Sequence, residues 1–202
     1  MAKKLGFAKS EVNWIRVPFN TAFAPGPKKF DVDINQISFK PVRAKAVDFS
    51  NSYYDVNQAM VVLRGRPIAQ AEGIDELKPY KLGAQLGTTS YDFIQDRVKP
   101  TKQPAVFDTN DAAVQALKNK QIDGLVVDLP TAFFVTAAQV ENSRILGQFQ
   151  STTKEHFGMV LEKGNSLTQC VNSALAQLRT DGTLQDIQDQ WLSKVAGAPV
   201  LH

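Results

Sequence analysis

Short apolar runs alternate with amphipathic stretches through the middle of the chain. The apolar runs predict strands because they are brief and bounded by turn residues, and the stretches after them have the apolar spacing of helices. The expected strands are residues 81–85, 105–107, 124–127 and 144–148, and the expected helices are residues 87–98, 109–120 and 128–139. This alternation is typical of an α/β fold in which helices cover both faces of a parallel sheet.

The residues on either side of this block predict further elements. Strands are expected at residues 11–17, 31–37, 59–63 and 156–162, a helical turn or two at residues 42–47, and helices at residues 166–179 and 184–195. The strands near residues 59–63 and 156–161 bracket the middle block, which predicts two lobes joined by two connections. The first lobe is expected to be discontinuous, with residues 1–62 plus 160–202, and the second to hold residues 63–159 and the hinge strands. A cleft between two lobes is a common place for a small-molecule site.

The composition narrows the class of protein. The chain has 202 residues, of which 43% are hydrophobic and 21% charged, as in a soluble globular protein. Its net charge of +3 is not concentrated in any cluster of Lys and Arg, which argues against a nucleic-acid partner. The sequence shows no secretory signal peptide and no apolar run long enough to span a membrane.

The residue types that most often carry catalysis or bind metal are scarce. The sequence has two histidines, no zinc-ligand spacing and no nucleophile elbow, so we expect neither a metal, nor a cofactor, nor an enzyme. Cys170 is the only cysteine, and its place in an expected helix favours a buried thiol. Trp14 and Trp191 are both expected to pack in the first lobe.

Arg43 is the first candidate for a binding role. It lies on a short helix that begins at Pro41 after a strand, and we expect it at the carboxyl end of a parallel sheet, where α/β proteins bind ligands. Its guanidinium offers a planar fork of donors that suits a carboxylate, whereas the alternative is an ordinary arginine on an exposed turn. Ser38 at the strand end is a further donor, and Asn35 and Gln36 are expected to line the floor of the same site.

The segment 85–93, QLGTTSYDF, is the second candidate. It predicts a strand end, a glycine and then the start of a helix, where N–H groups without helical partners favour an anion. Thr88, Thr89 and Ser90 are expected to form this cradle next to Gln85. The alternative is that Thr88 or Thr89 only caps the helix.

Asp128 in VVDLPTAF is the third candidate. It precedes Pro130 at the start of an expected helix, so it is either a simple N-cap or a carboxylate that both caps the helix and faces a ligand cation. Together, the three candidates offer positive potential for an acid group and one negative charge for an ammonium group. Free α-amino acids carry both groups on neighbouring atoms.

Four collinear motifs resemble one known family over nearly the whole chain. SFKPVRAKAVDFSNSYYD is similar to a T-x-x-R-x-x-x-x-D-F-S-x-P-Y-Y signature, and KLGAQLGTTSYDFI to a G-V-x-x-G-T-T segment. ALKNKQIDGLVVDLPTA resembles a G-x-x-D-A-x-x-x-D stretch, and LRTDGTLQDIQDQW a terminal D-G-T helix that ends in Trp. The family is the polar amino-acid substrate-binding proteins of ABC importers, solute-binding protein family 3, whose fold is the two-lobed type II periplasmic binding protein.

The resemblance implies roles for these residues. It implies that Arg43 and the N–H of Thr89, with Ser90 beside it, bind the ligand α-carboxylate, that Ser38 contacts the ligand backbone, and that Asp128 binds the α-ammonium. It also implies non-catalytic capture of a polar L-amino acid by hinge closure and delivery to a membrane permease. In full-length form such a protein is periplasmic, or extracytoplasmic and lipid-anchored.

The chain departs from the family pattern in two ways. Gln36 stands where the pattern has glycine, which implies that the floor of the binding site is narrower. The family begins with a strand and a long helix, whereas this chain begins inside that helix at AKKLGF, so the resemblance implies a truncated first lobe. The loss of a central strand predicts that the chain dimerises or exchanges elements through that lobe. Two alternatives stay open: a binding-impaired fragment that oligomerises in this way, and a dehydratase of the kind that some relatives became.

Overall fold

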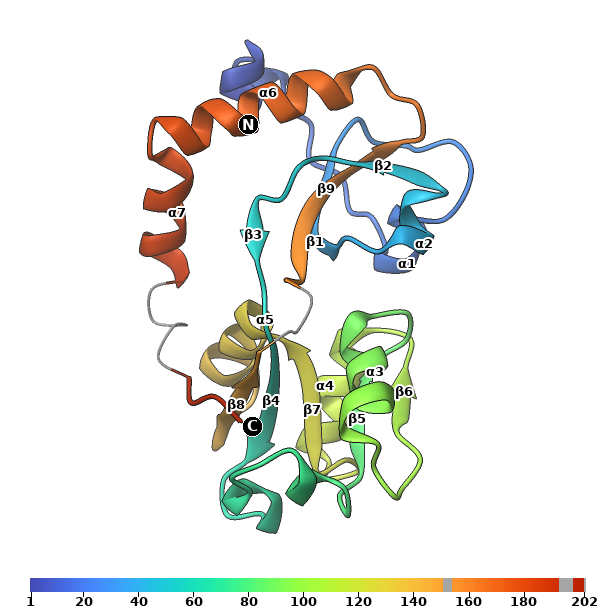
Figure 1. Ribbon diagram of the computed structural model, residues 1–202, viewed down its shortest axis with the longest axis vertical. Helices are drawn as coiled ribbons and strands as arrows, with labels where there is room; N and C mark the ends of the chain where they lie inside the picture. The colour runs from blue at the N-terminus through green and yellow to red at the C-terminus, as the bar shows by residue number, and fades with distance from the viewer. Residues whose placement is uncertain (151–153, 193–197, 202) are drawn as a thin grey trace. The chain divides into compact units, whose positions relative to one another are not determined.

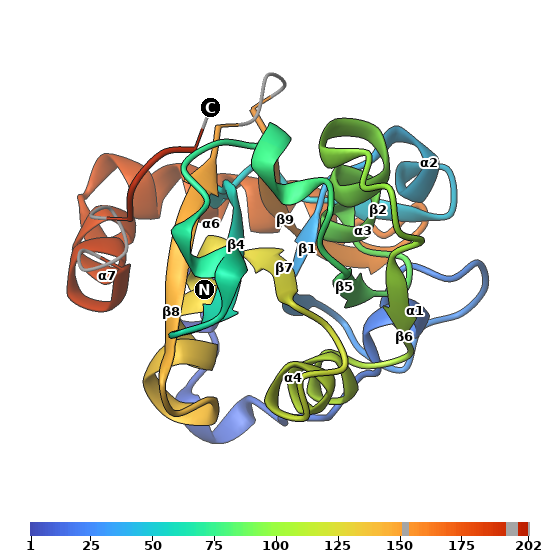
Figure 2. The ribbon, with the colours of Figure 1, turned by 90° about the horizontal axis from the view of Figure 1, so that it is seen from below.

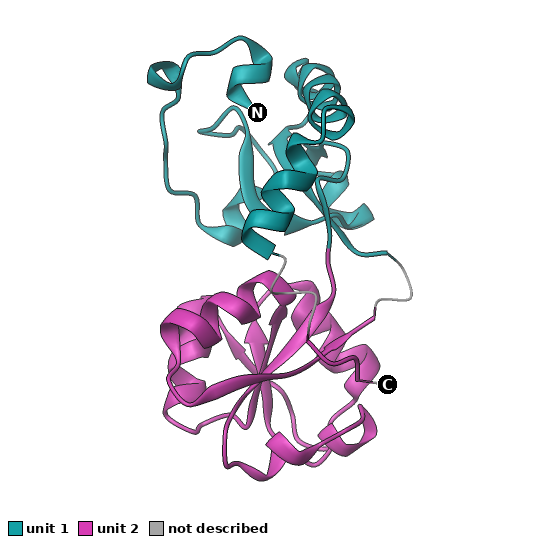
Figure 3. Cartoon of the chain, turned by 90° about the vertical axis from the view of Figure 1, so that its left-hand side faces the viewer, with its two compact units in different colours: residues 1–55, 154–193 teal, residues 56–153, 194–202 magenta. Residues whose placement is uncertain are grey.

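The chain forms two compact units in a computed structural model that describes residues 1–150, 154–192 and 198–201. Unit 1 comprises residues 1–55 and 154–193, and unit 2 comprises residues 56–153 and 194–202 (Figure 3). The expected lobe limits, 1–62 plus 160–202 and 63–159, differ from these in three places. Residues 56–62 and 194–202 belong to unit 2, and residues 154–159 belong to unit 1.

The sheet of unit 1 is built around a strand from late in the sequence. This strand, β9 (His156–Glu162), lies between β1 (Asp33–Ser38) and β2 (Val47–Phe49), and the short β3 (Tyr54–Asp55) pairs with its first residues (Figure 1). All three pairings are antiparallel. The expectation that Arg43 follows a strand of a parallel sheet is therefore wrong, because the partner of that strand is a returning strand and not the next strand of a βα repeat.

Alternate residues of β9 enter two small cores of unit 1. Val160 packs with Ala22, Ile37 and Val47 in one apolar cluster, whereas Met159 and Leu161 pack with Val171 and Leu175 in another. This follows from the two-residue period of a strand. The helices of the unit are α1 (Phe19–Ala22), α2 (Pro41–Ala44), α6 (Leu167–Thr180) and α7 (Thr183–Leu192), with 3₁₀ turns η1 (Ala2–Leu5) and η2 (Lys9–Glu11).

Three expectations for unit 1 are wrong. The strand expected at residues 11–17 is absent, since none of these residues is in a strand. Trp14 and Trp191 do not pack in the core, since they are 80% and 72% exposed. Cys170 is exposed, because the buried stripe of α6 begins one residue later, at Val171, and neighbouring helix positions point in different directions.

The sheet of unit 2 has five strands in the order β6-β5-β7-β4-β8. The strands are β4 (Gln58–Leu63), β5 (Leu82–Gln85), β6 (Ala105–Phe107), β7 (Gly124–Asp128) and β8 (Ser143–Phe149). The parallel sheet that we expected is found for β6, β5 and β7, whereas β4 runs antiparallel to both of its neighbours. β4 precedes the βα repeats in the chain, so no crossover helix fixes its direction.

The helices of unit 2 follow its strands as the sequence predicts. α3 (Thr89–Phe93) and α4 (Asn110–Lys118) lie on opposite faces of the sheet (Figure 2). α3 and α5 (Leu129–Phe134) continue into π-helical turns η5 (Ile94–Val98) and η6 (Val135–Gln139), and η3 (Pro67–Gln70) and η4 (Asp75–Leu77) are short 3₁₀ turns. In the described part of the chain, no helix has both the length and the apolar character needed to cross a membrane.

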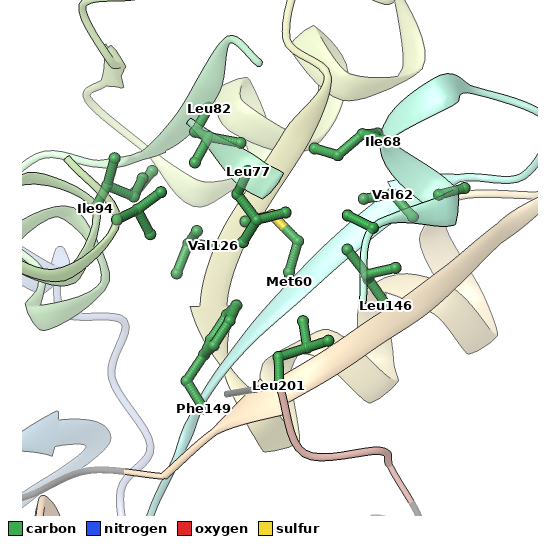
Figure 4. Packing of buried hydrophobic residues seen from close by; sticks show 14 residues of the cluster. Met60, Val62, Ile68, Leu77, Leu82, Ile94, Val126, Leu146, Phe149 and Leu201 are labelled. Atoms are coloured by element: carbon green, nitrogen blue, oxygen red, sulfur yellow. The ribbon is translucent and has the colours of Figure 1, made fainter. Parts of the chain in front are cut away.

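The main core of unit 2 lies on the α3 face of the sheet. Met60 and Val126 of neighbouring strands pack there with Ile94 and Phe149 (Figure 4). Leu201, far away in sequence, completes this core: Gln148 N–H donates to the carbonyl of Pro199 at 2.7 Å, and Leu201 N–H donates to that of Gln148 at 2.9 Å. The segment 199–201 is thus held against β8 by backbone hydrogen bonds and by one buried side chain.

Candidate functional site

Arg43 is buried, and two aromatic rings and a backbone carbonyl are among its contacts. Only 5% of the residue is exposed, so the alternative of an ordinary arginine on an exposed turn is wrong. Its guanidinium carbon lies 4.3 Å from the ring centre of Phe23 and 5.6 Å from that of Phe19, and its Nη1 donates to the Ser38 carbonyl at 2.6 Å. Ring faces and a carbonyl attract the guanidinium. These contacts hold the side chain in one direction.

Ser38 connects Arg43 to an acidic residue that the sequence analysis missed. Ser38 ends β1 and is buried, and its Oγ donates to Glu155 Oε1 at 2.6 Å. Glu155 directly precedes β9, and Ser38 is the register partner of Phe157 in that strand. The pairing of two strands far apart in sequence brings them together, so only a correct pairing of residues 33–38 with 156–162 would have revealed this contact.

Asn35 and Gln36 lie at an irregularity of β1, where the register with β9 shifts between Asp33 and Ile37. Both residues are exposed, and Gln36 has a left-handed backbone with φ of 54°. Glycine adopts that conformation without strain, which gives a physical reason for the glycine of the family pattern at this position. Asn35 N–H donates to Asp33 Oδ1 at 2.7 Å, and its Nδ2 donates to the Val17 carbonyl at 3.5 Å.

Asp33 is a buried carboxyl group beside this irregularity. The residue is 7% exposed, and its Oδ2 is buried without a hydrogen-bond partner. Burial raises the pKa of Asp33, and the hydrogen bond from Asn35 N–H opposes this only in part. Asp33 was not predicted as a site residue, because a single acidic residue in a short strand belongs to no recognisable motif.

The start of α3 in unit 2 is organised by Thr88. Its Oγ1 accepts from Tyr91 N–H at 3.2 Å and donates to the Gln85 carbonyl at 2.7 Å, so the N-cap alternative is correct for Thr88. Thr89 is then the first helical residue, and Ser90 behind it is buried. The Gln85 side chain donates to the Asp108 carbonyl at 3.3 Å.

Asp128 ends β7 and precedes α5, but its side chain makes no capping hydrogen bond. Asp128 thus stands at the expected N-cap position, but the side-chain hydrogen bond of a capping carboxylate is absent. Its Oδ1 instead accepts from Gln58 Nε2 at 2.7 Å, and the same amide nitrogen lies 3.3 Å from Thr89 Oγ1. Gln58 is 3% exposed and was missed by the sequence analysis. The available signal was a single polar residue at the start of an otherwise apolar strand.

Each unit thus brings part of the expected residues together. In unit 1, Arg43 and Ser38 are in contact, while Asn35 and Gln36 lie on the exposed irregularity of the same strand. In unit 2, Asp128 and Thr89 share the amide of Gln58, and Thr88 contacts Gln85. The set in unit 1 is built around a buried arginine, and the set in unit 2 around a helix start beside a carboxylate. Among the described residues, no group of three or more His, Cys, Asp or Glu is arranged to hold a metal ion.

Known proteins resemble the chain in sequence. It is 29% identical to the L-cystine-binding protein TcyJ of Escherichia coli K12, with 81% of this chain and 60% of that protein covered. It is 30% identical to ABC transporter arginine-binding protein 1 of the same strain, with 81% and 67% covered. The chain thus spans about 60% of the length of the cystine-binding protein.

Solved structures agree with the sequence relatives. An ancestral arginine-binding protein bound to glutamine superposes with a TM-score of 0.80 at 32% identity, covering 95% of this chain and 83% of that one. An ancestral amino acid-binding protein described as a precursor of cyclohexadienyl dehydratase superposes with a TM-score of 0.76 at 26% identity, covering 94% and 80%. The expected fold class, an α/β type II periplasmic binding protein, is confirmed.

One family profile matches residues 1–194, which is nearly all of the sequence. Its description is that of bacterial extracellular solute-binding proteins, family 3. The profile, the relatives and the two sheets lead to the same assignment: the chain belongs to the bacterial extracellular solute-binding proteins of family 3.

Proposed function

We propose that the chain binds a polar L-amino acid outside the cytoplasm, without converting it, and delivers it to an ABC transporter for import. The observation that carries the proposal is Arg43, a buried guanidinium that is held against Phe23 and the Ser38 carbonyl. A guanidinium that is already held in position loses little conformational entropy when a carboxylate binds. The amino-acid ligands named for the relatives support this class of ligand.

In this proposal both units contribute to one site. The α-carboxylate is bound by Arg43 of unit 1 and by Thr89 at the start of α3 in unit 2, and the α-ammonium is bound by Asp128. Ser38 contacts the ligand backbone, and Thr88 and Ser90 flank Thr89 at the carboxylate. Asn35 and Gln36 line the floor, and Gln36 and Gln85 face the side chain of the ligand. A ligand held from both units favours a closed arrangement by its higher affinity for it, and a membrane permease recognises that form.

The first prediction concerns Arg43 itself. Calorimetry with a panel of amino acids is expected to find at least one ligand for the wild type, and Arg43→Lys is expected to weaken binding by about 1.5–3 kcal/mol because it loses the bidentate hydrogen bonds. A thermal-shift assay gives an independent readout, since a ligand at about 100 times its dissociation constant stabilises by about 2.7 kcal/mol.

Arg16→Lys is the matched control, because Arg16 is exposed and has no place in the proposed site. It is expected to bind as the wild type does. The proposal fails if no amino acid binds the wild type in either assay, or if Arg43→Lys retains full affinity.

A second candidate is a binding-impaired chain that forms dimers or exchanges elements through unit 1. The observation in its favour is apolar exposure in that unit: Trp14, Ile15 and Ile34 are 80%, 52% and 47% exposed. Among the described residues, β1 pairs with β9 on one side and with no strand on the other. An open strand edge beside apolar side chains is a template for pairing with another chain.

A further inference from the structure

The side chain of Gln58 contacts two residues of the proposed site that lie on different elements. Its Nε2 donates to Asp128 Oδ1 at 2.7 Å and lies 3.3 Å from Thr89 Oγ1. The first contact has the short distance of a charge-assisted hydrogen bond, and the second has the length of a neutral one. One buried amide therefore joins the end of β7 to the start of α3.

The strand register fixes where this amide lies. Gln58 stands directly opposite Asp128 in the antiparallel pair of β4 and β7, so the two side chains share one face of the sheet. On its other side Gln58 stands opposite Phe149 of β8. The ring of Phe149 is buried and packs 4.6 Å, centre to centre, from that of Phe93 on α3. A buried aromatic wall thus bounds Gln58 on the side away from Asp128.

The chemistry of an amide suits this place. A lysine or arginine opposite Asp128 would neutralise the carboxylate, and a leucine would leave its Oδ1 without this donor. A glutamine amide donates a hydrogen bond and carries no charge. It therefore fixes the direction of the carboxylate and favours its ionised form without adding a positive charge beside it.

We infer that Gln58 is a positioning residue that holds the Asp128 carboxylate for the α-ammonium of the ligand and fixes the Thr89 hydroxyl beside it. The ligand role rests on the proposed function, whereas the contact between Gln58 and Asp128 is part of the structure. Gln58 acts through Asp128, so its effect depends on whether the ligand carries an ammonium group.

Gln58→Met tests this, because methionine has nearly the same length and no donor. We expect it to weaken binding of the best amino acid about tenfold or more, the usual effect of one lost hydrogen bond to a charge. The α-hydroxy acid with the same side chain lacks the ammonium group and is expected to lose less than about threefold. Equal losses for both ligands would show a structural role only and would overturn the inference, as would no loss for either.

Two further variants separate position from stability. In an Asp128→Asn background, Gln58→Met is expected to have little additional effect on amino-acid binding, since the charge that Gln58 serves is gone. Gln148→Met is the matched control: Gln148 is another buried glutamine, on β8, whose Nε2 donates to the Ala198 carbonyl. It is expected to leave the ratio of amino-acid to hydroxy-acid affinity unchanged.

A measurement without ligand distinguishes failure of this inference from failure of the proposed function. The carboxyl carbon of Asp128 can be followed by NMR against pH in the unliganded protein. Loss of the donor in Gln58→Met is expected to move the midpoint of this titration upward, because the donor favours the ionised form, and Gln148→Met is expected to leave it in place. If the wild type binds no amino acid, the proposed function fails, but the titration midpoint of Asp128 still tests the role of Gln58. A midpoint that does not move in Gln58→Met refutes that role.

Discussion

Asp33 shows how one residue can oppose the stability of the unit that contains it. Its carboxyl group is buried in β1, and its Oδ2 has no hydrogen-bond partner. Because burial raises the pKa of Asp33 in the folded chain, the folded state favours the protonated carboxyl group. Protonation of Asp33 therefore stabilises the folded state. This contribution is complete below the pKa of Asp33 in the unfolded chain, and it is lost as the pH rises through the higher pKa in the folded chain. At neutral pH the buried carboxylate therefore lowers the free energy of unfolding.

Asp33→Asn is expected to raise the free energy of unfolding by about 1 kcal/mol near pH 7, since an amide keeps an acceptor for Asn35 N–H and carries no charge. The gain should shrink towards zero near pH 4, where the wild-type carboxyl group takes up its proton. Denaturant unfolding at both pH values measures this. Asp31→Asn, at an exposed position nearby, should change stability by less than about 0.5 kcal/mol. A gain of equal size at both pH values would contradict the explanation.

At the scale of elements, the sequence predicts best what local signals determine. The expected helix at residues 109–120 begins with Thr109 as its N-cap, whose Oγ1 accepts from Ala112 N–H at 3.1 Å. Gly6 ends the first helical turn of the chain, η1, with φ of 91°. These features depend on residues only a few positions apart, so a single sequence reveals them.

Non-local pairing accounts for most of what the sequence did not reveal. The antiparallel direction of β4, the contact of Gln58 with Asp128 and that of Ser38 with Glu155 all depend on which strands become neighbours. The sequence placed Asp128 correctly at a strand end before a helix, but it could not show which side chain would stand opposite. Residues 11–17 have an alternating pattern and still form no strand, because a pattern alone does not supply a pairing partner.

The docking of the segment 199–201 on β8 allows a prediction at the same scale. A methyl group at Gly147 would lie 2.5 Å from Leu201 Cγ and 2.9 Å from the Pro199 carbonyl oxygen, so Gly147→Ala must displace the segment or strain it. We expect a loss of about 1–3 kcal/mol in the free energy of unfolding and faster exchange of the Leu201 amide hydrogen.

Leu201→Ala supplies the matched background for this test. Alone it is expected to cost about 2–4 kcal/mol by emptying its place in the core of unit 2. In its presence Gly147→Ala should cost less, because the Leu201 atoms that the methyl group meets are gone and only the Pro199 carbonyl oxygen remains. Strictly additive losses would show that the two positions do not interact.

At the scale of the whole molecule, the exposed apolar residues of unit 1 predict self-association. Light scattering during size-exclusion chromatography should give twice the chain mass of 22.2 kDa at high concentration and approach the single-chain mass on dilution. Trp14→Ser combined with Ile34→Thr should shift the equilibrium towards the monomer, because both substitutions remove exposed apolar surface of unit 1.

Trp191→Ser is the control for this experiment, since Trp191 is an equally conspicuous exposed aromatic residue on α7. It should leave the dimerisation constant unchanged if association runs through β1. A single-chain mass at every concentration would rule out the dimer. A change in the dimerisation constant caused by Trp191→Ser would show that the interface includes α7.

The exposed thiol of Cys170 has a practical consequence. It is the single cysteine of the chain and stands on the outer side of α6, beside the buried stripe that anchors this helix to unit 1. A maleimide dye can therefore be attached at one defined place without any substitution. With a second dye on a cysteine introduced in unit 2, energy transfer between the two would report whether adding an amino acid changes the separation of the units.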